Sequence, residues 1–356
     1  MTPRRLEEVR RKLSQLKLQA IVITVLPHVR YLTGFTGSNG VCVVTLDNQF
    51  FLTDGRYQEQ IREEVQGFRP IVSSGSLFEA MKNQKVLAKT SRVGYESQHV
   101  SVSSFAVLQK QFPRHKFVPT TSLVEEIASV KDPDEIESIK RAVQITDEVF
   151  EQLLGIIKEG IRENEVAAEI AYRHRKLGAE ADAFEPIVAS GVRGALPHAR
   201  ASQKVIQKGD MVTLDLGCRY RGYHSDLTRT VSVGAPSDEL KRVYQVVRDA
   251  QEKALTFARS GVKAKSLDAI ARKHIASQGL GKYFSHSLGH GLGLEVHELP
   301  RVSRLSKDTL KTGNVITVEP GVYIPGVGGV RIEDDVVIQN GSCKVLNTSS
   351  KELIVL

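Results

Sequence analysis

The 356-residue sequence has no tryptophan, only three cysteines and no apolar run long enough to span a bilayer. Cys42, Cys218 and Cys343 are odd in number, far apart and outside any Cys-x-x-Cys spacing, which argues against a disulfide framework or a cysteine zinc site. The opening residues carry charges of both signs and lead into no apolar segment, so they do not resemble a secretory signal. These absences predict a cytoplasmic protein with reduced thiols and no membrane segment.

Long blocks of one charge sign are also missing, although the formal net charge is +8. Basic residues alternate with acidic ones in residues 4–17 and 241–253, a pattern typical of solvated amphipathic helices. A nucleic-acid-binding surface would instead need a basic stripe that neutralises phosphates. The charge pattern therefore predicts that nucleic acid is not a partner.

The length exceeds what one core usually supports and predicts two domains. In residues 1–123, short β-branched strands alternate with helical segments, which is typical of an α/β domain. We expect strands at 20–25, 40–46, 49–53, 70–72 and 92–95, and helices at 4–19, 56–65 and 103–112. This domain carries no evident chemical site of its own.

A long helix is predicted to open the second domain. Asp132 is a good N-cap, Pro133 suits the first helical position, and acidic residues follow in the first turn. Apolar residues then recur at helical spacing until Gly160. We place a linker at 124–131 and the second domain at 132–356, with further helices at 164–178, 238–259 and 267–278.

The second domain contains an internal repeat. Residues 209–217 and 313–321 align without a gap as glycine, apolar strand, acid and glycine, which implies two similar halves. The acids that end these strands are Asp215 and Glu319, and after a turn a second acid follows in each half, Asp226 and Glu333. A carboxylate in a buried strand is costly unless it is paired or binds a cation. The alternative for each acid alone is a salt bridge to Arg229 or Arg331.

Three histidines, His286, His290 and His297, lie in one glycine-rich run at 285–301. Clustered imidazoles beside small residues suggest a site, although a loop with surface histidines is the alternative. Four acids and His290 make a ligand set for two divalent ions. These ligands favour Mn²⁺, with Co²⁺ or Zn²⁺ as alternatives, over a closed structural zinc site. Two ions about 3.5 to 4 Å apart can share a water and lower its pKa.

Several motifs together resemble a known family. They are Ala195-Leu-Pro-His-Ala, Asp215-Leu-Gly, Ser225-Asp-Leu-Thr-Arg-Thr, His286-Ser-Leu-Gly-His-Gly, Thr317-Val-Glu-Pro-Gly and Gly329-Val-Arg-Ile-Glu-Asp. Over nearly its full length the chain resembles metallopeptidases of the prolidase and aminopeptidase P type. The resemblance implies an α/β N-terminal domain followed by an α+β pita-bread (creatinase-like) catalytic domain with a pseudo-twofold repeat. It also implies a homodimer, with the loop at 35–39 reaching a neighbour's site.

The resemblance further implies roles for individual residues. The metal ligands would be Asp215, Asp226, His290, Glu319 and Glu333, with Asp226 and Glu333 bridging both ions. A metal-bridging hydroxide would attack the carbonyl of an X–Pro bond, while Glu319 takes and returns the proton.

Other side chains are expected to contact the substrate or support the ligands. His198 and His297 would bind the substrate carbonyl and the developing oxyanion, and His286 would support this pocket. Arg331 is expected to orient Asp226 from a second layer. Phe184, with Ile187 and Val188, would form a pocket for the proline ring, although a plain core strand is equally consistent with their apolar character.

The choice between a dipeptide and a longer peptide depends on Arg301. Its position resembles one where prolidase-like members bind the free carboxylate of a dipeptide, and a guanidinium can do so bidentately. The short separation between Glu319 and Glu333 along the sequence also resembles that of prolidase-like members. We therefore expect an Xaa-Pro dipeptidase. The alternatives are an Xaa-Pro aminopeptidase (aminopeptidase P) and a metal-free binding protein of the same fold.

Overall fold

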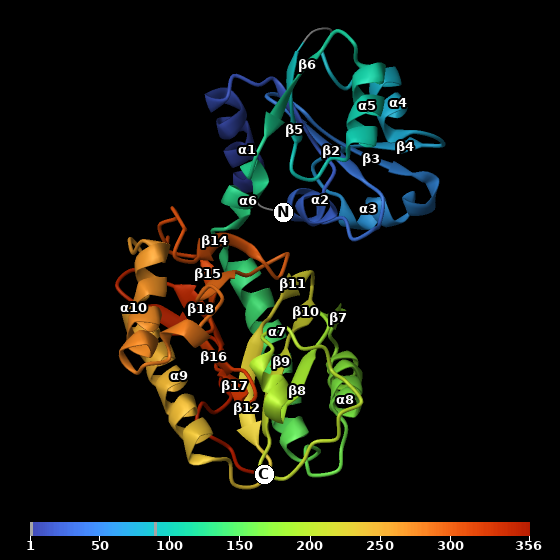
Figure 1. The fold of residues 1–356 in the computed structure, drawn as a ribbon. Helices are drawn as coiled ribbons and strands as arrows, with labels where there is room; N and C mark the ends of the chain where they lie inside the picture. The colour runs from blue at the N-terminus through green and yellow to red at the C-terminus, as the bar shows by residue number, and fades with distance from the viewer. Residues whose placement is uncertain (1–2, 89–90) are drawn as a thin grey trace. The chain divides into compact units, whose positions relative to one another are not determined.

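The structure of the protein, a computed structural model, describes residues 3–88 and 91–356 and divides into two compact units, Met1–Ala128 and Ser129–Leu356 (Figure 1). The predicted linker at 124–131 contains a helix, α6 (Leu123–Ala128). Among the described residues, no helix combines the length and the apolar character needed to cross a membrane.

The first unit is a mixed six-stranded sheet with helices around it. The sheet order is β4-β3-β2-β1-β5-β6, in which β1 pairs antiparallel with β2 and parallel with β5. The strands are β1 (Ala20–Ile23), β2 (Val41–Thr45), β3 (Gln49–Asp54), β4 (Arg69–Ser73), β5 (Arg92–Glu96) and β6 (Lys116–Thr120). The helices before α6 are α1 (Pro3–Gln15), α2 (Leu26–Thr33), α3 (Gln60–Glu64), α4 (Leu77–Asn83) and α5 (Val102–Gln111).

Several elements of this unit differ from the prediction: α2, α4 and β6 were not expected, and one expected helix is divided. Residues 56–65 were expected to form a continuous helix, but they contain the short η1 (Gly55–Tyr57) and α3. The Asp54 carboxylate accepts a hydrogen bond from the backbone N–H of Arg56 (3.0 Å) and pairs with its guanidinium. This cap closes a tight turn at the end of β3, so that the helix begins later.

The second unit places strands between two pairs of helices (Figure 1). The helices are α7 (Pro133–Leu154), α8 (Glu163–Lys176), α9 (Asp238–Phe257) and α10 (Ala264–Ser277), with short turns η2 (Gly191–Ala195) and η3 (Gly281–Tyr283). One sheet has the order β12-β9-β8 and another β14-β13-β15-β18-β19. Their strands are β8 (Ile187–Ser190), β9 (Met211–Leu216), β12 (Leu227–Ser232), β13 (Gly289–Gly291), β14 (Glu298–Val302), β15 (Val315–Val318), β18 (Asp334–Ile338) and β19 (Cys343–Val345).

Two smaller sheets complete this unit. Their orders are β11-β10-β7 and β16-β17. The strands are β7 (Ala181–Asp182), β10 (Cys218–Tyr220), β11 (Tyr223–His224), β16 (Gly321–Ile324) and β17 (Gly328–Arg331).

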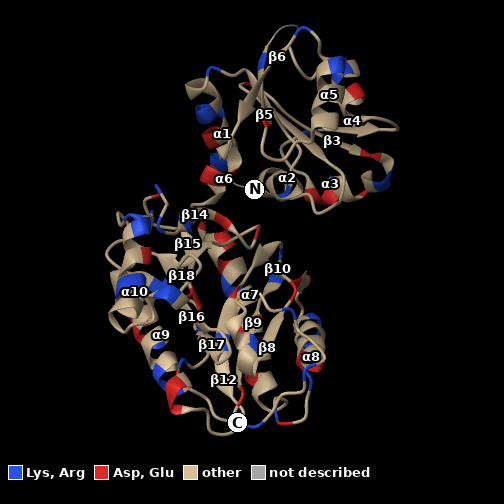
Figure 2. Ribbon diagram, viewed as in Figure 1, with Lys and Arg blue, Asp and Glu red and all other residues tan. Residues whose placement is uncertain are grey.

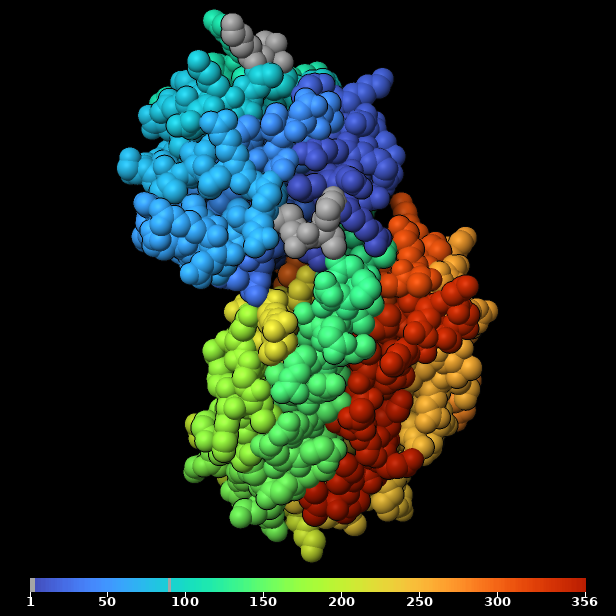
Figure 3. Space-filling view, turned by 180° about the vertical axis from the view of Figure 1, so that it is seen from behind, coloured from blue at the N-terminus to red at the C-terminus, as the bar shows by residue number. Residues whose placement is uncertain are grey.

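Helix α7 begins where the sequence predicts. The Asp132 side chain accepts a hydrogen bond from the backbone N–H of Glu135, and the Glu135 carboxylate accepts one from the backbone N–H of Asp132. Further along α7, Asp147 accepts hydrogen bonds from Thr348 and Ser349. The space-filling view shows the green α7 beside this red C-terminal segment (Figure 3). The helix therefore anchors the end of the chain.

The internal repeat is confirmed by backbone geometry. Glycines in the left-handed region recur in matching places: Gly160 and Gly261 (φ 95° and 87°), Gly178 and Gly279 (94° and 79°), and Gly209 and Gly313 (90° and 88°). Isolated bridges, Arg162 to Val205 and Lys263 to Thr309, follow the first pair. Each half therefore has the same order of two helices and an antiparallel strand pair, β9 with β12 and β15 with β18.

Charges of both signs share the surface of the helices in this unit. Figure 2 shows basic and acidic residues mixed along α9. Lys241 pairs with Asp238 (3.0 Å) and Arg248 with Glu252 (3.3 Å). This arrangement agrees with the alternating charges in the sequence.

Turn η2 lies against β17 at a contact that only glycine permits. A Cβ atom on Gly329 would lie 2.0 Å from the carbonyl oxygen of Gly194, and one on Gly194 would lie 3.1 Å from the backbone nitrogen of Gly329. Because both neighbours are backbone atoms, neither can turn away. The two glycines therefore determine how closely η2 approaches β17.

We predict that Gly329→Ala lowers the free energy of unfolding by about 1–3 kcal/mol, since an added methyl group must push the two segments apart. Chemical unfolding monitored by circular dichroism measures this change. The control is Gly155→Ala, where the nearest atom to a new Cβ is 3.8 Å away. Equal stability of the two variants would contradict the prediction.

Candidate metal centre

The two strand pairs bring four acids to corresponding places. Asp215 is the penultimate residue of β9, and Asp226 directly precedes β12. Glu319 directly follows β15, and Glu333 directly precedes β18, where Val318 pairs with Asp334. His290 comes from β13, which pairs with β15 through Gly291 and Ile316. The repeat therefore gathers candidate ligands from both halves.

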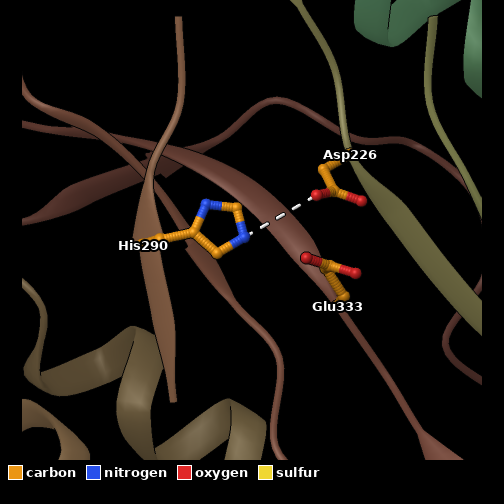
Figure 4. Close-up of side chains that lie close together, drawn as sticks. All are labelled: Asp226, His290 and Glu333. Atoms are coloured by element: carbon orange, nitrogen blue, oxygen red, sulfur yellow. Dashed lines mark ion pairs between the residues drawn. The ribbon is translucent and has the colours of Figure 1, made fainter. Parts of the chain in front are cut away.

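The side chains of Asp226, His290 and Glu333 point toward one another (Figure 4). Each offers a ligand atom, and these atoms all lie within 4.8 Å of one another. His290 Nε2 lies 3.8 Å from Asp226 Oδ2 and 3.3 Å from Glu319 Oε1. Four of the five predicted ligands thus form one cluster by distance alone.

Asp215 belongs to the same electrostatic group. Its charge raises the pKa values of Asp226, Glu319 and Glu333 in addition to the larger effect of burial. One oxygen of Asp215, Oδ1, is buried and has no hydrogen-bond partner. The same is true of Glu333 Oε1. Buried carboxylate oxygens without donors are expensive, and a bound cation would satisfy them.

The pKa values express how unfavourable these charges are by themselves. Burial raises the pKa of Glu319 to about 8. Burial and the neighbouring Glu333 raise the pKa of Asp226 well above its usual range. Burial and the neighbouring His297 lower the pKa of His290 to about 4, so that its imidazole is neutral. Four carboxylates and one neutral imidazole are a suitable donor set for divalent cations.

His290 is held in the tautomer that a metal ligand needs. Its Nδ1 lies 3.0 Å from the carbonyl oxygen of Gly291, which can only accept a hydrogen bond. Nδ1 therefore carries the proton, and the lone pair of Nε2 faces Asp226 and Glu319.

Threonines from both halves hold the acids. Thr228 donates to Glu333 Oε2 (2.6 Å), and Thr317 donates to Glu319 Oε1 (3.1 Å). Thr317 Oγ1 also accepts from the backbone N–H of His290 (3.1 Å). Thr317 thus orients two candidate ligands at once. The sequence analysis did not single out either threonine, although Thr317 stands at the same place in its repeated segment as Thr213 does in the other.

Arg331 has a different partner from the one predicted. It was expected to orient Asp226, but its Nη2 donates to Asp215 Oδ2 at 2.5 Å. The reason is that Arg331 Nε binds Thr228 (3.0 Å), which pairs across the β9–β12 ladder with Asp215. The backbone N–H of Asp226 instead donates to Asp335 Oδ2 (2.9 Å), a residue that the sequence analysis did not single out.

Tyr323 is a second residue that the sequence analysis missed. Its hydroxyl lies 2.7 Å from Arg331 Nη1 and 2.8 Å from His286 Nε2. His286 Nδ1 faces the carbonyl oxygen of Ser287 (2.7 Å) and so carries the proton of this ring. The tyrosine therefore accepts from Arg331 and donates to His286, whose pKa burial and Arg331 lower to about 3.

The remaining predicted residues lie around this group. The rings of His290 and His297 are 4.2 Å apart, and His297 is exposed. Burial lowers the pKa of His297, and the charges of His198 and Arg301 contribute to this shift, which places both near it. His198 and Arg301 are themselves exposed. Ile187 pairs with Asp215 across the β8–β9 ladder, whereas Phe184 is half-buried in the segment before β8.

A carboxylate-rich centre between two repeated halves is typical of enzymes that use divalent ions to activate water. The sequence profile of metallopeptidase family M24 matches residues 137–340, and that of the creatinase/prolidase N-terminal domain matches residues 5–130. The chain therefore belongs to metallopeptidase family M24 and is a peptidase, and the fold class predicted from the sequence is confirmed.

Relatives cover the whole chain. An uncharacterised peptidase of Bacillus subtilis is 44% identical over 99% of this chain and 100% of its own length. A solved structure named Xaa-Pro dipeptidase from Bacillus anthracis is 40% identical, with a TM-score of 0.96 over 99% of both chains. A structure named X-Pro aminopeptidase from Thermotoga maritima is 39% identical, with a TM-score of 0.90 over 97% of this chain and 100% of its own.

We predict that the metal-free protein becomes less stable as the pH rises from about 7 to about 8.5. Unfolded carboxylates, whose pKa is about 4, are ionised throughout this range. Folded Glu319 keeps its proton up to about pH 8, so the unfolded state binds fewer protons and is favoured as the pH rises. Thermal unfolding after EDTA treatment measures this dependence.

Glu319→Gln is the matched control for this measurement. An amide does not titrate, so the variant should lose less stability over the same pH range. Histidines with lowered pKa values are neutral in both states above about pH 7 and add no slope there. A melting temperature that rises with pH in the metal-free wild type would contradict the assignment.

Proposed function

We propose that the protein is a metal-dependent Xaa-Pro dipeptidase, a prolidase. The single observation that carries the proposal is the convergence of Asp226, His290 and Glu333 within ligand distance of one another, beside Glu319. The name of the Bacillus anthracis structure supports the substrate class, because that structure resembles this chain over nearly its whole length.

Asp215, Asp226, His290, Glu319 and Glu333 would hold the metal ions. Bound divalent ions supply an acidified water and polarise the peptide carbonyl. Mn²⁺ is our first choice because oxygen ligands predominate. We also propose a cytoplasmic homodimer. In this proposal the exposed loop around Ser38 contributes to a neighbour's site, although Phe35 itself is buried in its own unit.

Glu319 is the proposed proton carrier. Its carboxylate lies 3.3 Å from His290 Nε2 and is oriented by the hydrogen bond from Thr317, which suits a carboxylate that takes and returns a proton beside the metal ions. His198 and His297, both exposed, would bind the substrate carbonyl and donate hydrogen bonds to the developing oxyanion. His286 has both ring nitrogens engaged by protein groups, which suits support of the pocket rather than direct binding.

Arg301 is the proposed carboxylate-binding group. It is exposed on β14, and its charge acts on His297. A guanidinium there can bind the free carboxylate of a dipeptide one residue beyond the cut. Phe184 and Ile187 are the proposed walls of the proline pocket. Both are half-buried, and Ile187 pairs with the metal-ligand candidate Asp215.

The alternative is an Xaa-Pro aminopeptidase, which the name of the Thermotoga maritima structure favours. Removal of one residue from a longer peptide needs the same metal centre but no carboxylate site beside the proline. A metal-free binding protein is the least supported alternative, since it would leave the buried oxygens of Asp215 and Glu333 without a partner. Metal analysis of the purified protein tests that alternative.

We predict that the Mn²⁺-loaded protein cleaves Ala-Pro faster than Ala-Pro-Pro. In Arg301→Gln, KM for Ala-Pro should rise at least about 10-fold, since a hydrogen bond between charged groups is lost. Arg304→Gln is the control, because this exposed arginine lies on the loop after β14. Rapid cleavage of Ala-Pro-Pro alone would reject the dipeptidase in favour of the aminopeptidase.

We predict that Glu319→Gln lowers kcat for Ala-Pro by about 10²–10⁴-fold, the usual contribution of a positioned proton carrier. Metal content must be measured on the same sample, because Glu319 is also a proposed ligand. Near-normal turnover with both metals bound would remove the proton-carrier role and leave the other assignments intact.

A further inference from the structure

Glu163 is a fully buried carboxylate outside the metal centre. It is the first residue of α8 and accepts hydrogen bonds from both sides of one loop. Oε1 accepts from the backbone N–H and the hydroxyl of Ser190, both at 2.8 Å. Oε2 accepts from the backbone N–H (3.1 Å) and the hydroxyl (2.6 Å) of Ser202, and Arg193 Nε lies 3.0 Å away.

This carboxylate remains charged despite its burial. Burial alone raises the pKa of Glu163, but hydrogen bonds from Ser202 and Ser190 outweigh it and hold the pKa below its usual value. A buried charge with this many donors is strongly stabilised in one geometry and costly in any other. Glu163 therefore constrains its partners more than a helix cap would require.

The segment between these partners is the His198 loop (residues 191–201). Ser190 ends β8 where the loop begins, and Ser202 follows its last residue. Within the loop, Arg193 also donates to the carbonyl oxygen of Arg200 (2.6 Å). Glu163 thus fastens both ends of the loop to the start of one helix.

The opposite side of the His198 loop lies against the metal centre. Gly194 packs against the backbone of Gly329 on β17. The carbonyl oxygen of Pro197 accepts from Arg331 Nη1 (3.1 Å), the arginine that also donates to Asp215. His198 follows directly and acts electrostatically on both His286 and His297. Arg331 is itself held by Asp215, Thr228 and Tyr323, so a shift of the loop would move His198 more than it moves Asp215.

We infer that Glu163 is a positioning residue for the peptidase reaction, which acts through the His198 loop to hold His198 against the substrate. The inference rests on the proposed function, because it assumes that His198 contacts the substrate. It adds a residue that touches neither metal ligand nor substrate.

The second half of the unit uses a comparable device, which supports this reading. Asp268 of α10 is fully buried, pairs with Arg272 (2.8 Å) and accepts from the backbone N–H of Leu288 (3.1 Å). Arg272 donates to the carbonyl oxygens of Phe284 (2.9 Å) and His286 (2.8 Å). In both halves, the second helix supplies a buried acid that fastens a loop carrying a site histidine.

The test is a double-mutant cycle between Glu163→Gln and His198→Ala, with kcat/KM for Ala-Pro as the readout. Glu163→Gln should lower kcat/KM about 10- to 100-fold when His198 is present. It should have less than about a twofold effect once His198 is absent, because the two changes remove the same interaction. Metal content should stay unchanged. Glu169→Gln, a half-buried position of the same helix, is the matched control and should keep wild-type activity.

Amide hydrogen exchange provides a readout that does not depend on catalysis. Exchange in residues 191–201 should be faster in Glu163→Gln than in Glu169→Gln, while α9 and α10 stay unchanged. If Glu163→Gln does not fold, Ser202→Ala removes one donor from the same carboxylate and replaces it in both experiments.

Several results would overturn the inference. They are equal losses of kcat/KM with and without His198, full activity of Glu163→Gln, or unchanged exchange in the His198 loop. If the wild type with Mn²⁺ cleaves neither Ala-Pro nor Ala-Pro-Pro, the proposed function fails instead, and hydrogen exchange still decides whether Glu163 holds the loop.

Discussion

Mutual repulsion among buried carboxylates is the constraint on which the catalytic unit depends. Asp215, Asp226, Glu319 and Glu333 act on one another in a low-dielectric interior, and burial raises the pKa of the last three. Folding alone would not bring such groups together, because each would be more stable in water. Divalent cations reverse the sign of this interaction, so the same arrangement that is unfavourable by itself becomes a binding site.

The structure around the acids is correspondingly rigid. Arg229 is almost completely buried, yet it donates to Asp334, Ser349 and Ser350 and to the carbonyl oxygen of Glu333. It thereby ties the C-terminal segment to Asp334, the residue after the candidate ligand Glu333. Arg331 and Tyr323 form a second buried chain that runs from Asp215 to His286. The candidate metal ligands are thus held by groups whose own hydrogen bonds are satisfied, which fixes the orientation of these acids.

The sequence predicted the fold and the clustered acids well because both depend on local patterns. Repeated strands that end in an acid can be recognised in the sequence, as can the capping residues of α7. Residues that become partners only through sheet packing cannot be recognised in this way. Arg331 reaches Asp215 rather than Asp226 because Thr228 stands opposite Asp215 in the β9–β12 ladder, and that register is invisible without the fold. Glu163 was overlooked for a related reason, since an acid in a first helical turn usually reflects the helix dipole.

The matched glycines and strand pairs also have a consequence for how the centre can be divided. Neither half contains all the candidate ligands: the first contributes Asp215 and Asp226, and the second contributes His290, Glu319 and Glu333. Either half expressed alone would lack donors that the other supplies. The complete donor set therefore exists only while both halves are folded together, and the halves are unequal in it, because the candidate imidazole comes from the second half alone.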